Sequence, residues 1–98
     1  MTKEERLYVV AYDIRNERRW RRIFKLMNGY GEWVQLSVFQ CRLSQQRHAE
    51  MVALLDGIIA HGEDHIITID AGPAESIRPR VTSLGRTFEP VVREAVVV

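Results

Sequence analysis

The sequence predicts an α+β domain with the ferredoxin-like order β-α-β-β-α-β, followed by an extra C-terminal strand. Two stretches with the apolar spacing of amphipathic helices alternate with apolar, β-rich runs of strand length. The 98 residues suit a single domain, residues 1–98, and contain no linker-like stretch. Two helices cover only one face of such a sheet. A second subunit that packs sheet face to sheet face is therefore expected to cover the other face.

The first strand is expected at residues 7–12, a continuous apolar run typical of a strand buried on both faces. The strand ends at Asp13, where the chain surfaces. Asn16 is the expected N-cap of the helix that follows. A stripe with helical spacing gives this helix its core face: Trp20, Ile23, Phe24 and Met27. The helix is expected to end at residues 28–31, where Asn and Gly accept left-handed backbone angles.

Residues 33–43 are too many for one flat strand, because their apolar positions change parity. Two strands are expected, at about 33–36 and 38–43, with a bend or turn near Ser37. Ser44 is expected to cap a second helix that runs to His61-Gly62 and contains Gly57. The buried stripe of that helix is expected at Met51, Leu54, Leu55 and Ile58.

The fourth strand is expected at residues 65–70, and Ala71-Gly72-Pro73 is expected to break it. The chain ends in a valine-rich, β-prone segment, residues 91–98. Such a segment is an aggregation hazard when it is left unpaired. Residues 86–98 are therefore expected to pair with the sheet edge of the partner subunit.

The net charge of +1 hides an uneven distribution along the chain. Residues 1–49 hold ten Lys or Arg against five Asp or Glu, whereas residues 50–98 hold four against eight. Basic residues crowd into the first helix and the residues just before it: Arg15, Arg18, Arg19, Arg21, Arg22 and Lys25. This basic segment is a candidate site for a nucleic-acid backbone, although a solvated helix face explains the same pattern.

The composition excludes several classes of protein. A single cysteine, Cys41, allows neither an internal disulfide framework nor a Cys-rich zinc site, and it is expected to be an inert buried thiol. No apolar run approaches the roughly 18–20 residues that cross a bilayer. The charged residues 1–6 are unlike a secretory signal. A cytoplasmic protein that does not bind a membrane is expected.

Several segments resemble one known family. Tyr12-Asp13-Ile14 closes the first strand, and a basic helix follows it. Residues 33–39 (WVQLSVF), residues 64–69 (DHIITI) and the valine-rich end come later, in that order. In this order and spacing, residues 7–98 resemble the small CRISPR-associated endoribonuclease family (the "Cas-two" proteins), the smaller partner in the CRISPR spacer-acquisition complex.

The resemblance implies a prokaryotic homodimer that acts in CRISPR antiviral defence. It places the metal-binding acidic residue of the family on Asp13, which makes Asp13 the candidate catalytic residue. It also implies a Mg²⁺-dependent nuclease acting on RNA or double-stranded DNA, with Mn²⁺ as an alternative ion. A CRISPR integrase subunit is the further partner that it implies.

One aspartate is a poor magnesium site, because Mg²⁺ usually takes one or two carboxylates together with waters and phosphate oxygens. A twofold axis that brings Asp13 from both subunits together would supply the second carboxylate. Tyr12, Ser37 and Phe39 are the residues expected at the rim of this site. For Phe39, packing is the favoured alternative. For Ser37, a structural or phosphate-contacting hydroxyl is favoured over a nucleophile, since the sequence suggests no base beside it.

The sequence leaves three functions open. The first is a metal-dependent phosphodiesterase, in which water activated by the metal hydrolyses the bond. The second is a non-catalytic scaffold that binds nucleic acid and bridges CRISPR integrase dimers. The third is a regulatory module of the same fold that binds a small metabolite. Asp13 favours the first, and the basic helix favours the second. The third lacks support, because the chain has no Gly-rich ligand loop.

Overall fold

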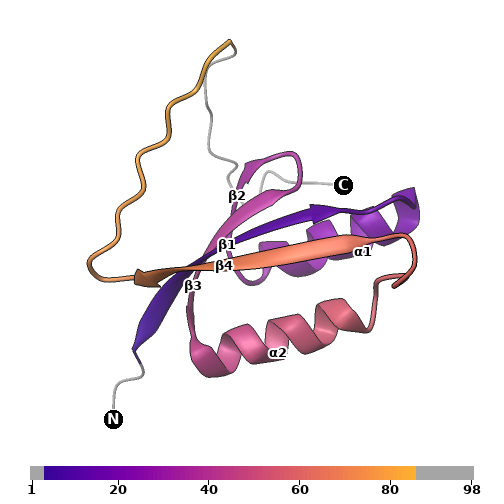
Figure 1. Cartoon of the computed structure of the whole chain (residues 1–98), viewed down its shortest axis with the longest axis horizontal. Coiled ribbons are helices and arrows are strands. Elements are labelled where there is room, and N and C mark those ends of the chain that lie inside the picture. Colours follow the sequence, from indigo (N-terminus) through magenta and orange to yellow (C-terminus); the bar gives the residue numbers. More distant parts are fainter. Residues whose placement is uncertain (1–3, 86–98) are drawn as a thin grey trace.

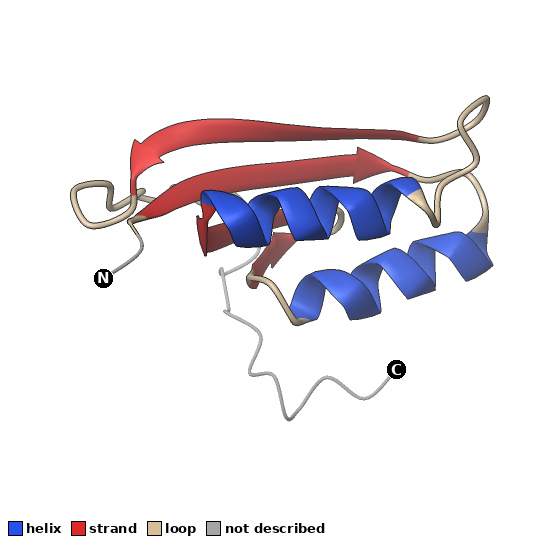
Figure 2. Ribbon diagram, turned by 90° about the horizontal axis from the view of Figure 1, so that it is seen from below, coloured by secondary structure: helices blue, strands red, loops and turns tan. Residues whose placement is uncertain are grey.

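The structure, a computed structural model, describes residues 4–85, so the C-terminal segment expected to pair with a partner lies outside it. The described chain forms β1 (Glu5–Asp13), α1 (Glu17–Asn28), β2 (Glu32–Gln35), β3 (Val38–Ser44), α2 (Gln45–Asp56) and β4 (His65–Pro73). The strands form one antiparallel sheet in the order β2-β3-β1-β4, and both helices lie on the same side of it (Figure 1, Figure 2). This arrangement confirms the predicted ferredoxin-like fold. None of the helices in residues 4–85 is long and apolar enough to span a membrane.

The core lies between the sheet and the two helices. Successive side chains of a strand point to opposite faces, so alternate residues of β1 and β3 are buried there. The buried cluster consists of Tyr8, Val10, Tyr12, Ile23, Phe24, Met27, Phe39, Cys41, Leu43, Met51 and Leu55. The predicted core face of α1 is confirmed, with Trp20 packed half-buried against the cluster.

Helix α1 begins where the sequence predicts, but it ends differently. The Asn16 side chain accepts a hydrogen bond from the backbone N–H of Arg19 at 3.0 Å, as expected of an N-cap. The C-cap Gly29 has a φ of −82°, so the predicted left-handed angle is not used there. Two residues later, at position 31, glycine is required because strand β3 leaves no room for a side chain. A Cβ at Gly31 would collide with the sulfur of Cys41 and lie 2.5 Å from the carbonyl oxygen of Gln40.

Helix α2 is shorter than predicted and buries fewer side chains. It begins after its cap Ser44, as expected, but it ends at Asp56, where Gly57 is the C-cap and not an interior residue. Met51 and Leu55 are buried, whereas Leu54 is 46% exposed. Adjacent residues of an α-helix lie about 100° apart around its axis, so burial centred on Leu55 turns Leu54 toward solvent. The prediction of a buried Leu54 is therefore wrong.

Strand β4 continues through the predicted break. Its pairing with β1 runs from His65 to Pro73, and the register shifts so that Leu7 pairs with Gly72 and Tyr8 with Asp70. The extra residue, Ala71, forms a β-bulge. Gly72 has a φ of +119°, which residues with a side chain rarely adopt. Glycine here bends the strand and does not end it.

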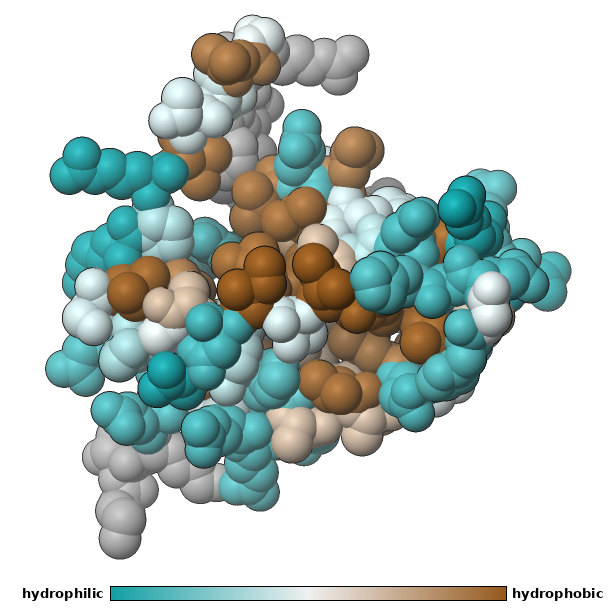
Figure 3. Space-filling view, viewed as in Figure 1, coloured by the Kyte–Doolittle hydropathy of each residue, from teal (hydrophilic) through white to brown (hydrophobic). Residues whose placement is uncertain are grey.

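No helix covers the other face of the sheet within residues 4–85. The β1 register places Val9 opposite Ile69, and Ala11 between Val38 and Ile67. Ile67 is 43% exposed and Ile69 is 52% exposed. Figure 3 looks onto this face and shows apolar side chains gathered over the middle of the sheet. The open-face patch, as it is called below, consists of Val9, Ala11, Val38, Ile67 and Ile69.

Replacing Gly31 by Ala is expected to lower the free energy of unfolding by roughly 1–3 kcal/mol, the usual cost of overpacking. The colliding atoms belong to β3, which cannot move away without disturbing its pairing with β1. Urea unfolding followed by circular dichroism measures the change. Gly62→Ala is the matched control, because nothing lies within 4 Å of its added Cβ. Equal losses in the two variants would contradict the packing argument.

Candidate functional site

Asp13 is the last residue of β1, and it surfaces there as predicted. Tyr12, the residue before it, points into the core. Because successive side chains of a strand point to opposite faces, the Asp13 side chain lies on the same sheet face as the open-face patch. The Asp13 side chain is 70% exposed, and Arg15 Nη2 lies 3.9 Å from its Oδ2 atom. Exposed pairs at this distance contribute little stability. The carboxylate is therefore accessible to a ligand.

One chain supplies only part of a metal site here. Within residues 4–85, no group of three or more His, Cys, Asp or Glu side chains is placed to hold a metal ion. An exposed Asp13 fits a Mg²⁺ ion that keeps waters and phosphate oxygens as its other ligands. The nearby Arg15 guanidinium repels a cation and attracts a phosphate. The described chain thus offers one carboxylate ligand and a neighbouring phosphate-binding group.

A second carboxylate, that of Asp64, organises the chain next to Asp13. Its side chain is 0% exposed. It accepts hydrogen bonds from Arg19 Nε at 2.6 Å, from Arg19 Nη2 at 3.2 Å, and from the backbone N–H groups of Ala60 at 2.8 Å and Arg15 at 3.0 Å. The Arg19 guanidinium holds the pKa of Asp64 well below its usual range, and the two backbone N–H groups add to this effect.

The structure divides the basic residues of α1 into two groups. Arg19 is only 22% exposed and binds Asp64 and Glu63, while Arg21 binds Glu17 with Nη1 2.7 Å from Oε1. Three exposed residues make no ion pair within the described part of the chain: Arg18, Arg22 and Lys25. Their i, i+4, i+7 spacing places them on one face of the helix. They are called the α1 stripe below.

Two of the residues predicted at the site rim lie in the core. Tyr12 is 7% exposed and Phe39 is 0% exposed, with ring centroids 6.3 Å apart. Burial raises the pKa of the Tyr12 hydroxyl, which has no hydrogen-bond partner among the described residues. Phe39 has no free face for a base, in agreement with the packing alternative. Burial also raises the pKa of the Cys41 thiol to about 12, as expected for an inert thiol.

The third rim residue, Ser37, lies in a braced turn between β2 and β3. Its hydroxyl accepts a hydrogen bond from Trp20 Nε1 at 2.9 Å, and its carbonyl accepts one from the Tyr12 N–H at 3.0 Å. Trp33 Nε1 donates to the carbonyl of Leu36 at 2.8 Å, and Leu36 has a φ of +36°. The turn predicted near Ser37 is confirmed, and it lies beside the end of β1.

The sequence did not reveal the ion pair between Asp64 and Arg19 or the two indole hydrogen bonds. Asp64 and Arg19 are 45 residues apart, and no spacing rule pairs them. The only signal was general: a basic first half and an acidic second half. Trp20 and Trp33 fitted apolar patterns, which do not show where an indole N–H points.

The chain matches the family model described as "CRISPR associated protein Cas2" over residues 6–76. The chain belongs to the Cas2 family. Over 94 residues it is 56% identical to the CRISPR-associated endoribonuclease Cas2 of Geobacter sulfurreducens, and the alignment covers 96% of this chain and 99% of the relative. It is 50% identical over 94 residues to CRISPR-associated endoribonuclease Cas2 1 of Rhodospirillum rubrum, covering 96% and 92%. The crystal structure of Streptococcus pyogenes Cas2 is similar, with a TM-score of 0.71 and 31% identity over 81% of this chain and 99% of that chain.

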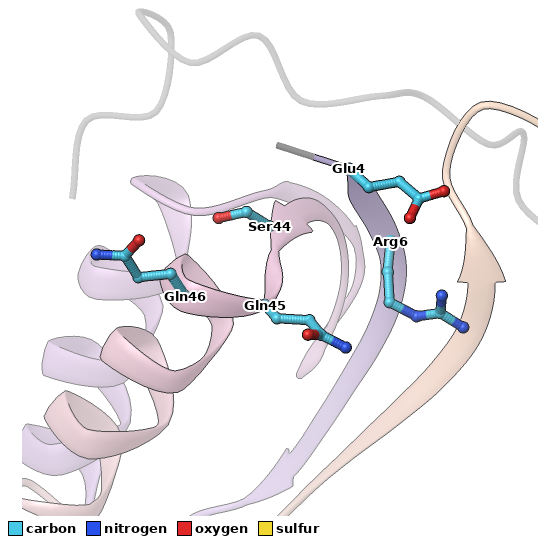
Figure 4. A pocket seen from close by; sticks show the side chains of 5 residues that line it. All are labelled: Glu4, Arg6, Ser44, Gln45 and Gln46. Atoms are coloured by element: carbon cyan, nitrogen blue, oxygen red, sulfur yellow. The ribbon is translucent and has the colours of Figure 1, made fainter. Parts of the chain in front are cut away.

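A pocket of about 300 Å³ lies away from Asp13 in this Cas2-family chain (Figure 4). It lies at the start of β1, whereas Asp13 ends that strand. The residues that line it are Glu4, Arg6, Ser44, Gln45 and Gln46. Arg6 Nε is already 2.7 Å from Asp70 Oδ2, and Glu4 adds a negative charge. The pocket therefore does not suit a phosphate group.

Acid is expected to destabilise this Cas2-family chain partly through Asp64. Because the folded-state pKa of Asp64 is lowered, its ion pair contributes stability above the ordinary aspartate pKa of about 3.9. This contribution is lost as the pH falls below that value toward the folded-state pKa. Asp64→Asn is expected to be less stable at neutral pH but to lose less stability on acidification. Denaturant unfolding at a series of pH values measures this, and parallel pH profiles for the two proteins would refute it.

Proposed function

We propose that this protein is a CRISPR adaptation (spacer-acquisition) protein, a homodimeric Mg²⁺-dependent endonuclease or endoribonuclease. The exposed Asp13 carboxylate at the end of β1 carries the proposal. It lies within a chain that is 56% identical to a relative named an endoribonuclease. A protein nucleophile finds no support, since the Ser37 hydroxyl is bonded to an indole and Cys41 is buried. A water molecule is the proposed nucleophile.

The residues near Asp13 have complementary tasks in this proposal. The Asp13 carboxylate is a ligand for the metal ion. The Arg15 side chain is 69% exposed, extends from the same connection and binds a phosphate oxygen of the scissile strand. Bound Mg²⁺, or Mn²⁺ in its place, would polarise the phosphodiester and lower the pKa of a water molecule.

A second copy of the chain would complete the site. The open-face patch and the Asp13 side chain lie on the same face of the sheet. Packing this face against its twofold mate would bury the apolar patch and bring two Asp13 carboxylates toward one ion. A cation between the carboxylates offsets their mutual repulsion.

Ile67→Glu is expected to convert the dimer to a monomer, because a sheet-to-sheet interface would bury the new carboxylate without a partner. Ile67 is 43% exposed in the single chain, so the variant is expected to fold. Sedimentation velocity measures the oligomeric state. Val52→Glu, at a 41% exposed position of α2, is the control that stays dimeric. A dimeric Ile67→Glu protein would show that this face is not the interface.

Asp13→Ala is expected to lower Mg²⁺-dependent cleavage by roughly a hundredfold or more, since changes even to partners of metal ligands cost 10–100-fold. The assay uses labelled single-stranded RNA and duplex DNA, each with Mg²⁺ or with EDTA. Asp56→Ala removes an exposed carboxylate on α2 and is expected to keep full activity. Equal cleavage by the wild type and Asp13→Ala would identify a contaminating nuclease and refute the site.

A nucleic-acid-binding scaffold that bridges CRISPR integrase dimers is the second candidate, and the α1 stripe favours it. Three exposed cations on one helix face suit a phosphate backbone, which is bound by charge and without sequence preference. Such a scaffold needs no reaction at Asp13. Salt-sensitive binding of duplex DNA without cleavage would favour this function over the nuclease.

Arg22→Gln is expected to weaken duplex DNA binding and to reduce the slope of log affinity against log salt. Each phosphate that the protein no longer neutralises lowers the magnitude of this slope by about 0.9. Fluorescence anisotropy over a range of salt concentrations measures it. Arg47→Gln on α2 is the control, because the Arg47 guanidinium lies over the Tyr30 ring, 4.8 Å from its centroid. An unchanged slope in Arg22→Gln would exclude that residue from the interface.

A further inference from the structure

The Asp64 carboxylate joins three segments that are distant in sequence. Its Oδ1 atom accepts from the Arg15 N–H of the β1–α1 connection, and its Oδ2 atom accepts from the Ala60 N–H of the α2–β4 connection. Arg19, in the first turn of α1, donates to both oxygens. The carboxylate is 0% exposed, so these bonds are strengthened by their low-dielectric surroundings.

Two of these constraints act directly on Asp13. The Arg15 N–H lies two residues beyond Asp13 and is fixed to Asp64 at 3.0 Å. On the opposite side, Asp13 pairs in the sheet with His65, the residue that follows Asp64. Among the described residues, the only ion-pair or hydrogen-bond partner of the Asp13 side chain is Arg15, at 3.9 Å. The position of Asp13 and the direction of its Cα–Cβ bond are therefore set by the backbone that Asp64 holds.

The chemistry of the pair is specific to an ionised carboxylate and a guanidinium. An asparagine at position 64 would present one acceptor oxygen and one NH₂ group, so a donor would face either the Arg19 guanidinium or a backbone N–H. A lysine at position 19 would keep the charge but lose the planar group that spans both oxygens. Neither substitution preserves all four bonds.

The chain contains a matched arginine–aspartate pair far from Asp13. Arg6 Nε donates to Asp70 Oδ2 at 2.7 Å, and Asp70 Oδ1 also accepts from the Gly72 N–H at 3.0 Å. This pair also joins β1 to β4, but it lies near the start of β1, where Asp70 pairs with Tyr8. It therefore resembles the Asp64–Arg19 pair in chemistry but differs in position and in burial, since the Asp70 side chain is 42% exposed and that of Asp64 is 0% exposed.

We propose that Asp64 and Arg19 are positioning residues for Asp13. They hold the β1–α1 connection and so fix the backbone from which the Asp13 carboxylate and the Arg15 side chain extend. The inference rests on the metal-binding role proposed above for Asp13. It also removes Arg19 from the surface that binds nucleic acid.

The test compares Asp64→Asn and Arg19→Lys with Asp70→Asn and Arg6→Lys in the full chain. Mn²⁺ binding is followed by the electron paramagnetic resonance of the free ion, and hydrogen exchange of the Arg15 amide is followed by NMR. Both pairs are expected to lower the thermal midpoint when disrupted. Only disruption of the Asp64–Arg19 pair is expected to weaken Mn²⁺ binding. Asp64→Asn is expected to raise the Mn²⁺ half-saturation by roughly 10–100-fold, the range for partners of metal ligands, and to expose the Arg15 amide. Arg19→Lys is expected to give a smaller shift in the same direction, and it provides the readout if Asp64→Asn does not fold.

The outcomes separate this inference from the proposed function. If Asp13→Ala abolishes Mn²⁺ binding while folded Asp64→Asn and Arg19→Lys bind as the wild type does, the positioning role is overturned and the Asp13 site stands. If Asp13→Ala binds Mn²⁺ like the wild type, both proposals fail. Equal shifts in the Asp64 and Asp70 variants would reveal a general effect of destabilisation and would also overturn the positioning role.

Discussion

Strand β1 is hydrogen-bonded on both sides, to β3 and to β4, and this double pairing determines where the functional side chains lie. A strand with two neighbours cannot slip by one residue without turning all of its buried side chains to the other face. Because Tyr8, Val10 and Tyr12 fill the core, the residues between them form the opposite face. Asp13 continues that second row. The packing of the core thus decides that the carboxylate shares a face with the open-face patch.

Local signals in the sequence were sufficient for most of the architecture. Asn16 and Ser44 cap their helices through their own side chains, an interaction within three residues that a sequence displays directly. The errors arose where tertiary pairing overrides a local preference. Gly72 looks like a strand breaker, yet pairing with β1 carries the strand through it as a bulge. Leu54 fits a helical stripe, but the sheet contacts only the side of α2 that carries Met51 and Leu55.

The candidate site was only partly accessible from the sequence. The position of Asp13 at a strand end followed from the apolar run before it, whereas its metal-binding role came from resemblance and stays a proposal. The Asp64–Arg19 pair was missed because it spans 45 residues and links elements whose relative placement only the fold provides. A count of basic residues also overstated the charge on α1 that is free to bind phosphate. Acidic side chains from α1 itself and from the connection before β4 already pair with two of its arginines.

The braced turn between β2 and β3 gives the protein a spectroscopic property. The chain has two tryptophans, and the indole N–H groups of both donate to this turn, to the Leu36 carbonyl and to the Ser37 hydroxyl. Indole emission responds to the hydrogen bonding and polarity around the ring. The turn is bonded to Tyr12, the residue before Asp13. The intrinsic tryptophan fluorescence of the unlabelled protein therefore arises entirely from rings attached to the turn beside Asp13, and ligands or partners that move this turn become visible without an added dye.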